Sequence, residues 1–469
     1  MAARNLSVGS VPKLVVILAL PVLATFVLQS LYALADLYFV GRLGGAALAG
    51  LGISLNTFFL VLAVGQGVGT GGLALLAQTY GRGDHARVPH LFQQVFWLSL
   101  AIGLLFWVGG FLLAQPFVEA FTEDPAVLRA GVDFFRAYCG TFFTQVMLIA
   151  LSFAFRAVGD FIVPTAIMGI SVLLNVALDP ALIFGFGPIP ALGVAGAGLA
   201  TFLSQCVGLA GYFWLVRGTR RNKLLTVRLP FRVDVGTMGQ MLKIGLPAGI
   251  QYILFTATLL IAYRYARPFG GEVTAAIGVG FRIVQCAFFP AVAIGASVAS
   301  LVGQNYGARQ FSRVRAAIGW GILYMTVVLT AEYALILANP HVWVSAFAKE
   351  ASIVNIGADY LVISGAVLPV YALSMIATFS SQGLGRTGGP LLGVSLRFVM
   401  GTLALVALDS WNGLTVARLF WTGAFAMLAE AALMGLLLAF LWRTTLHHAD
   451  GSTAAPPLRA PPQAAPAVE

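Results

Sequence analysis

The sequence Gln78-Thr-Tyr-Gly81 returns as Gln304-Asn-Tyr-Gly307, 226 residues further along the chain. The same offset relates other residues without a gap: Pro21 and Pro247, Gly44 and Gly270, Phe121 and Phe347, Asp133 and Asp359, and Pro164 and Pro390. A repeat of this length and regularity indicates two halves built from one ancestral unit.

The composition places both halves in a membrane. Hydrophobic residues make up 59% of the 469 residues and charged residues 9%, against about 25% charged residues in soluble domains. Twelve apolar stretches are long enough to cross a bilayer as helices. The predicted spans are 14–40, 52–78, 91–114, 130–156, 162–185, 192–216, 240–265, 273–303, 316–338, 355–381, 390–409 and 416–442. Because no alternating strand pattern is present, we predict an all-α polytopic membrane protein with six helices in each half.

The positive charges predict the topology. Most of the 27 Lys and Arg residues fall in the loops on the side that also holds both termini, so we predict that both termini are cytoplasmic. The net charge of +10 is thereby explained without a nucleic acid. With six helices per half, the halves are parallel repeats related by an axis along the membrane normal.

The predicted organisation is an N-terminal lobe at 1–216, a basic linker at 217–239, a C-terminal lobe at 240–445 and a disordered tail at 446–469. The three cysteines lie within predicted helices and have no paired spacing. They predict neither a disulfide framework nor a zinc site.

The two halves differ in their buried polar residues. Under the repeat offset, Asp36 falls on Ala262, Asn175 on Gly401, Asp179 on Leu405 and Thr201 on Met427. A carboxylate near a helix centre costs about 2.5–3.5 kcal/mol on insertion scales, so such a residue suggests function. The candidate carboxylates therefore lie in the first half alone.

Helical spacing groups these residues. Asn175 and Asp179 are one turn apart and share a helix face, and Thr201 adds a hydroxyl from the next helix. Tyr32 lies one turn before Asp36, where its phenol could hydrogen-bond the carboxylate. Pro21, earlier in the same helix, predicts a kink between itself and Asp36.

Each candidate also has a structural interpretation. Asp36 could reach the nearby membrane interface, and Asp179 could end its helix, since Pro180 follows it. Asn175 and Thr201 could each make an ordinary interhelical hydrogen bond.

Three motifs in order resemble the multidrug and toxic compound extrusion (MATE) transporters. They are Asp36-Leu-Tyr-Phe-Val-Gly-Arg-Leu-Gly44, the Gln-Thr-Tyr-Gly and Gln-Asn-Tyr-Gly pair, and Leu174-Asn-Val-Ala-Leu-Asp-Pro180. The resemblance covers about residues 10–445. It implies a cation-coupled exporter with two six-helix lobes around a central cleft, in which small organic molecules are the substrates.

The DinF-like branch of that family carries a cation site in its N-terminal lobe. Its motif positions match Asp36, Asn175, Asp179 and Thr201, so the resemblance implies that these four residues bind H⁺ or Na⁺. The NorM-like branch instead uses acidic residues in the seventh and tenth helices. At the corresponding places this sequence has Gln251 and the run Tyr371-Ala-Leu-Ser-Met, neither of which supplies a carboxylate, so the resemblance implies that this second site is absent.

These observations lead to a mechanistic hypothesis. Removal from water disfavours a charged carboxyl group, whereas a bound cation favours it, so protons, cations and substrate can compete for Asp36 and Asp179. Entry of H⁺ or Na⁺ would bend the first helix near Pro21 and expel substrate from the N-terminal lobe. We expect a monomer in a bacterial inner membrane, with lipid as its surroundings, no nucleic-acid partner and no cofactor besides the coupling ion.

The rival classes are a major-facilitator antiporter, a lipid or lipid-linked precursor flippase and an intramembrane enzyme. The first would need a basic loop after its second helix that Gly81-Arg-Gly-Asp-His fits poorly. A flippase cavity should be basic, whereas few basic residues lie within helices, and the flippase stays the alternative. An enzyme would need a catalytic motif, which the spans lack. Arg282 and Glu430 could form a buried pair or a substrate contact, and we expect a structural role.

Overall fold

The computed structural model describes residues 5–188, 190–218, 225 and 233–447. Side chains are described throughout these ranges except at 45–58, 215–218 and 445–447. Most of the predicted linker and nearly all of the predicted tail lie outside the described residues, so their boundaries stay predictions.

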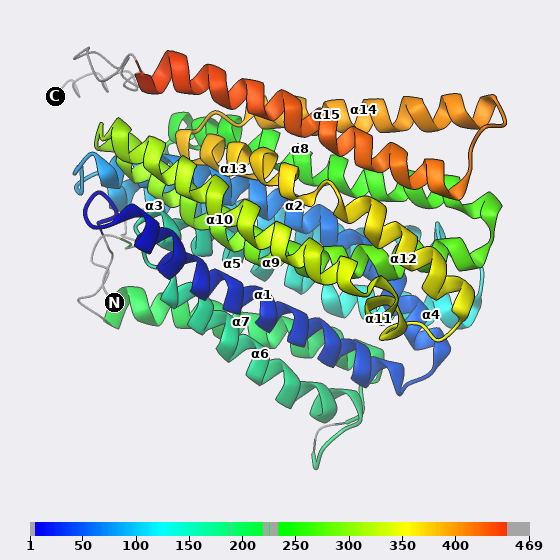
Figure 1. The fold of residues 1–469 in the computed structure, drawn as a ribbon. Helices are drawn as coiled ribbons and strands as arrows, with labels where there is room; N and C mark the ends of the chain where they lie inside the picture. Colours follow the sequence, from blue (N-terminus) through cyan, green and yellow to red (C-terminus); the bar gives the residue numbers. More distant parts are fainter. Residues whose placement is uncertain (1–4, 189, 219–224, 226–232, 448–469) are drawn as a thin grey trace.

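The first half forms a bundle of long helices (Figure 1). Its helices are α1 (Val11–Gly41), α2 (Gly45–Gly81), α3 (Val88–Glu119), α4 (Pro125–Tyr138), α5 (Gly140–Ala157), α6 (Ile162–Ile183) and α7 (Val194–Gly218).

The second half repeats this order. Its helices are α8 (Val235–Ala266), η2 (Arg267–Phe269), α9 (Gly271–Gly307), α10 (Phe311–Ala338), α11 (Pro340–Ser345), α12 (Ala351–Gly365), α13 (Leu368–Leu384), α14 (Gly388–Ser410), α15 (Val416–Leu441) and η3 (Trp442–His447).

The helix boundaries follow the sequence repeat. α2 and α9 begin and end at positions that differ by the same 226 residues as their motifs, and α6 and α14 begin at equivalent positions. α4 followed by α5 likewise corresponds to α12 followed by α13. The predicted all-α fold with two repeated lobes is confirmed.

Two of the predicted spans are broken helices. The span predicted at 130–156 is divided at Cys139 between α4 and α5, so its prediction as one helix is wrong. α12 and α13 are bent by 55° at the equivalent place. Eleven described helices are long and apolar enough to cross a membrane, and this bent pair makes twelve. Large apolar side chains such as Leu34 and Leu112 are exposed on the outside of the bundle, as lipid contact requires.

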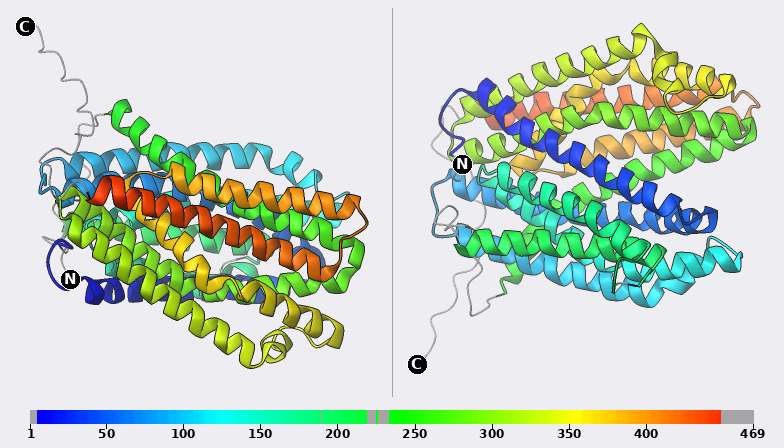
Figure 2. Two further views of the ribbon diagram at one scale, coloured as in Figure 1. Left: turned by 45° about the horizontal axis from the view of Figure 1, so that its top comes forward. Right: turned by 90° about the horizontal axis from the view of Figure 1, so that it is seen from below.

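α1 begins and α15 ends at the same end of the bundle (Figure 1), which we call the terminal face. The opposite end is the distal face. α1 starts in a core shared with α9 and α10 of the second half and ends beside α6 of its own half (Figure 2). It thus links the two lobes along its length.

The lobes meet near the terminal face through glycines. A Cβ atom on Gly71 would overlap the backbone of Met241, and one on Gly245 would overlap the backbone of Gly67. Small residues of this kind allow α2 and α8 to approach at backbone distance. The terminal face is therefore closed between α2 and α8.

The repeated glutamines bridge the lobes in the same region. Gln78 Nε2 donates to the Gly383 carbonyl at 3.0 Å, and Gln304 Nε2 donates to the Ala157 carbonyl at 2.7 Å. Gly383 and Ala157 are themselves equivalent under the repeat offset. We call this pair of contacts the glutamine latch.

The segment before α1 adds a contact with the other lobe. Leu6 is fully buried, its backbone N–H donates to Gln304 Oε1 at 2.9 Å, and its carbonyl accepts from Asn305 at 3.2 Å and from Arg313 at 3.1 Å. The start of the N-terminal lobe is therefore held by the C-terminal lobe.

The N-cap of α8 also joins the lobes. Asp234 accepts from the Thr237 hydroxyl at 2.6 Å and backbone N–H at 2.9 Å and contacts His90 of α3 at 3.1 Å. The Thr237 hydroxyl above all, then its backbone N–H, lowers the pKa of Asp234 to about 2. Since this pKa is depressed, the stabilisation is present above about pH 4 and is lost as pH falls toward 2.

We expect Asp234→Ala to destabilise the protein by more than the about 0.5–2 kcal/mol of an ordinary lost N-cap, because a contact with α3 is lost as well. Asp124→Ala is the matched control, since Asp124 caps α4 through Ala126 and Val127 alone. Thermal unfolding in detergent between pH 5 and 8 checks this. Equal losses in the two variants would mean that the contact with α3 contributes nothing.

Candidate functional site

The structure brings together carboxyl groups from two helices. Asp36 lies on α1 and Asp179 on α6, and the two carboxyl groups interact with each other. Asn175 interacts with both, and its Nδ2 donates to Asp179 Oδ1 at 3.2 Å. Asn175 and Asp179 are fully buried. We call Asp36, Asn175 and Asp179 the carboxylate site.

α6 places its two residues as the spacing predicts. The helix continues through Pro180 to Ile183, so Asp179 lies inside a helix and the interpretation of it as a helix-end residue is wrong. The pair shares one face because four residues make about one turn.

Asp36 is partly buried as a residue, but its Oδ1 has no contact with solvent. This oxygen, Asn175 Oδ1 and Asp179 Oδ2 are all buried without a hydrogen-bond partner. The side chains that interact with the two carboxyl groups are the other carboxyl group, Asn175 and, for Asp36, two tyrosines, and none of these carries a positive charge. Three buried acceptors without donors are costly unless a positive species binds them.

The hydroxyl groups of Tyr32 and Thr201 make their hydrogen bonds outside the carboxylate site. The Tyr32 hydroxyl bonds Ser204 Oγ of α7 at 2.7 Å and donates to the Thr201 carbonyl at 3.4 Å, rather than to Asp36. The Thr201 hydroxyl donates to Ala197 within its own helix at 3.0 Å. Both residues are buried, and Tyr32 still interacts with Asp36 electrostatically.

Two neighbours were missed by the sequence analysis. Ser204 anchors Tyr32 to α7, and Tyr138, at the end of α4, interacts with Asp36. Ser204 lies three residues after Thr201 and could have been found from that helical spacing. Tyr138 could not, because no spacing along the chain relates α4 to α1.

Pro21 lies inside an uninterrupted α1, so the predicted kink does not break the helix in this state. Its carbonyl accepts from Thr25 at 3.0 Å and from Thr165 of α6 at 2.7 Å. The two hydroxyls are also 2.9 Å apart. This threonine clamp ties the middle of α1 to the helix that carries Asp179.

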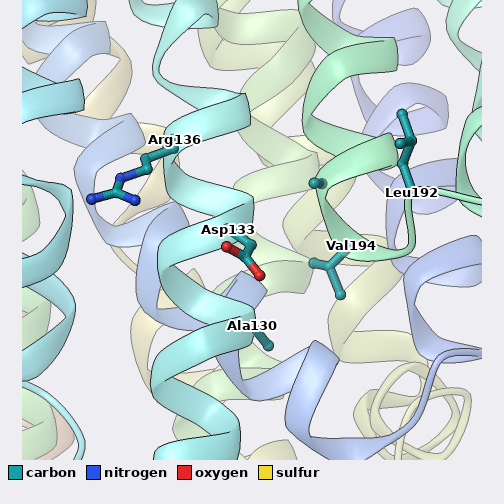
Figure 3. Close-up of a pocket in the computed structure, with 6 residues that line it drawn as sticks. Ala130, Asp133, Arg136, Leu192 and Val194 are labelled. Carbon is teal, nitrogen blue, oxygen red and sulfur yellow. The ribbon is translucent and has the colours of Figure 1, made fainter.

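A superficial cavity lies between α4 and the start of α7 (Figure 3). It has a volume of 430 Å³ and is lined by Ala130, Asp133 and Arg136 of α4 and by Leu192, Val194 and Ala195 around the start of α7. Both charged side chains are exposed, and Arg136 extends away from α7 (Figure 3). It shares no residue with the carboxylate site.

The C-terminal lobe holds a different arrangement. Glu430 forms a buried ion pair with Arg397 at 3.1 Å rather than with Arg282, which was one of the possibilities that the sequence left open. Arg282 is exposed and lies near Tyr263. Among the described residues, no group of three or more His, Cys, Asp and Glu could hold a metal ion.

The sequence profile of the MatE family matches residues 21–181 and 247–404. The two matches begin at positions that are equivalent under the 226-residue offset. The chain belongs to the MatE family. It is therefore a multi-span membrane transporter and not an enzyme, and the resemblance seen in its motifs is confirmed.

The MatE chain is similar to curated relatives over nearly its full length. It is 25% identical to the probable multidrug resistance protein YoeA of Bacillus subtilis, covering 92% of this chain and 94% of that protein. It is also 25% identical to the multidrug export protein MepA of Staphylococcus haemolyticus, covering 87% and 89%.

Solved structures share its fold. An outward-facing MATE transporter of the MOP superfamily matches with a TM-score of 0.86 at 21% identity over 94% of this chain and 97% of that one. A variant of the Vibrio cholerae MATE transporter VcmN matches with a TM-score of 0.85 at 20% identity over 94% and 98%.

Proposed function

We propose that this protein is a cation-coupled antiporter that exports cationic or amphipathic organic compounds across a bacterial inner membrane by alternating access. The observation that carries the proposal is the carboxylate site, where two acidic side chains interact with each other and hold buried oxygens that have no positive partner among the described residues. The names of the relatives, which describe multidrug export and resistance, support the substrate class.

The chemistry of the site suits exchange of a positive charge. Two adjacent carboxylates repel each other in a low-dielectric site, and one H⁺ or Na⁺ relieves that repulsion. Oxygens of Asp36, Asn175 and Asp179 would hold the ion, and we include Thr201 with them because its hydroxyl oxygen, which donates to Ala197, can still accept or coordinate. No other cofactor is required.

α1 connects this site to the rest of the transporter. It carries Asp36 near the distal face and crosses the threonine clamp before it reaches the core shared with α9 and α10. A change in charge at Asp36 would thus alter how α1 packs against α6. Because the terminal face is closed here, substrate would leave on the distal side, with both termini in the cytoplasm.

We expect Thr165→Val to shift the ion concentration for half-maximal efflux about threefold, since one hydrogen bond inside a membrane protein averages about 0.6 kcal/mol. Thr258→Val is the control, because that hydroxyl bonds only Leu254 in its own helix. Ion titrations of efflux compare the two. Identical shifts would show that the clamp to Pro21 has no role.

The proposal is tested with purified monomer reconstituted into liposomes under an imposed pH or Na⁺ gradient. Efflux of a fluorescent organic cation that follows the gradient supports antiport. Gradient-independent movement of labelled lipid without dye efflux would overturn the proposal and favour a flippase.

A further inference from the structure

A buried polar cluster occupies the C-terminal lobe away from the carboxylate site. Glu430 of α15 pairs with Arg397 of α14 at 3.1 Å, and the two residues are 1% and 5% exposed. Ser374 of α13 donates to Glu430 Oε1 at 2.8 Å. Tyr371 of α13 donates to Glu430 at 3.3 Å and accepts from Arg397 at 2.9 Å.

This cluster lies on the helices equivalent to those of the carboxylate site. Under the repeat offset, α14 corresponds to α6 and α15 to α7. Arg397 falls on Ser171, one turn before Asn175, and Glu430 falls on Ser204, the residue that binds Tyr32. The C-terminal lobe therefore places its two buried charges within about one helical turn of the positions that correspond to Asn175 and Ser204.

The two lobes differ in how the negative charge is compensated. In the N-terminal lobe, the two carboxyl groups of the carboxylate site lack a positive partner within the part of the chain that the structure describes. In the C-terminal lobe, one carboxylate is paired with a guanidinium, which stays charged in proteins and is covalently held. Among the described residues, the titratable or charged groups that interact with Glu430 are Arg397 from α14 and Tyr371 from α13, and α8 and α12 contribute none.

We propose that Arg397 is a resident counter-ion that prevents Glu430 from binding an exchangeable proton or Na⁺, and so limits ion coupling to the N-terminal lobe. This inference rests on the proposed function, because it concerns how many ions that function uses. Arg397 acts only through Glu430. It thereby limits the number of ions that the transporter exchanges for each substrate. Removing its charge converts the second lobe into an ion-binding lobe.

The test follows protonated carboxyl groups by infrared difference spectroscopy of purified protein between alkaline and acidic pH. Asp36→Asn with Asp179→Asn should remove the principal protonated-carboxyl band. Adding Arg397→Gln to that background should create a new band, and adding Glu430→Gln should abolish it again. Arg397→Lys, which keeps a resident positive charge, should create no band.

The failures of the two proposals are distinguishable. If the Asp36 and Asp179 changes remove the wild-type band but Arg397→Gln creates none, the inference fails and the proposed function stands. If those changes leave the wild-type band and Glu430→Gln removes it, the carboxylate site is not the exchange site.

A second variant guards against misfolding of a chain with one uncompensated charge. Arg397→Gln with Glu430→Gln removes both charges, and replacing a buried ion pair by neutral residues is often tolerated. This double variant should exchange as many ions per substrate as the wild type in liposomes. A lower ion count would show that Glu430 takes part in coupling and would overturn the inference.

Discussion

Asp36→Asn is expected to abolish ion-driven export while leaving the amount of folded protein in the membrane unchanged. The amide keeps the shape of the side chain but removes one of the two charges of the carboxylate site. A contact to a charged group is worth about 1.5–3 kcal/mol, so ion affinity should fall about ten- to 150-fold at about 1.4 kcal/mol per decade. Efflux should approach the level of protein-free liposomes.

Asp133→Asn is the matched control for this change. Asp133 belongs to the same lobe, is exposed and lines the superficial cavity rather than the carboxylate site. Efflux of a fluorescent cation under a pH or Na⁺ gradient should be near wild type in this control. Wild-type efflux in Asp36→Asn would reject the assignment of Asp36.

Gly307→Ala is expected to prevent closure of the terminal face. A Cβ atom at Gly307 would overlap the backbone carbonyl of Gln78, and one at Gly81 would overlap that of Gln304, on the two sides of the glutamine latch. Overpacking of this kind costs about 1–3 kcal/mol, which is roughly a five- to 150-fold shift away from the closed state. Export should fall because the transporter stays open at this face.

Spin labels at the exposed positions Asp84 and Ser312, one in each lobe near the latch, report this opening as a longer distance. Gly109→Ala is the control, since a Cβ atom there meets nothing within 4 Å. Unchanged distances and unchanged export in Gly307→Ala would show that the glycine contacts do not gate the terminal face.

The sequence predicts the repeat and the helices well because both are local patterns. Matching motifs at Gln78 and Gln304 align α2 with α9, and the spacing of Asn175 and Asp179 places both on one face of α6. The break at Cys139 was missed, because an interrupted span and a continuous one have the same hydrophobic length.

Contacts between helices were harder to predict. Tyr32 was expected to bond Asp36, one turn away, but its hydroxyl reaches α7 and bonds Ser204. A pair of Glu430 with Arg282 was one possibility from the sequence, whereas the partner of Glu430 is Arg397 on the neighbouring helix. Helical spacing identifies which residues share a face but leaves open which helix that face meets.

Release of protons on addition of Na⁺ or substrate to the purified transporter tests the carboxylate site most directly. If Asp36 and Asp179 share one exchangeable positive charge, wild-type protein at mildly acidic pH should release protons into a weakly buffered solution, and the Asp36→Asn, Asp179→Asn variant should release none. Equal proton release from both proteins would contradict the account.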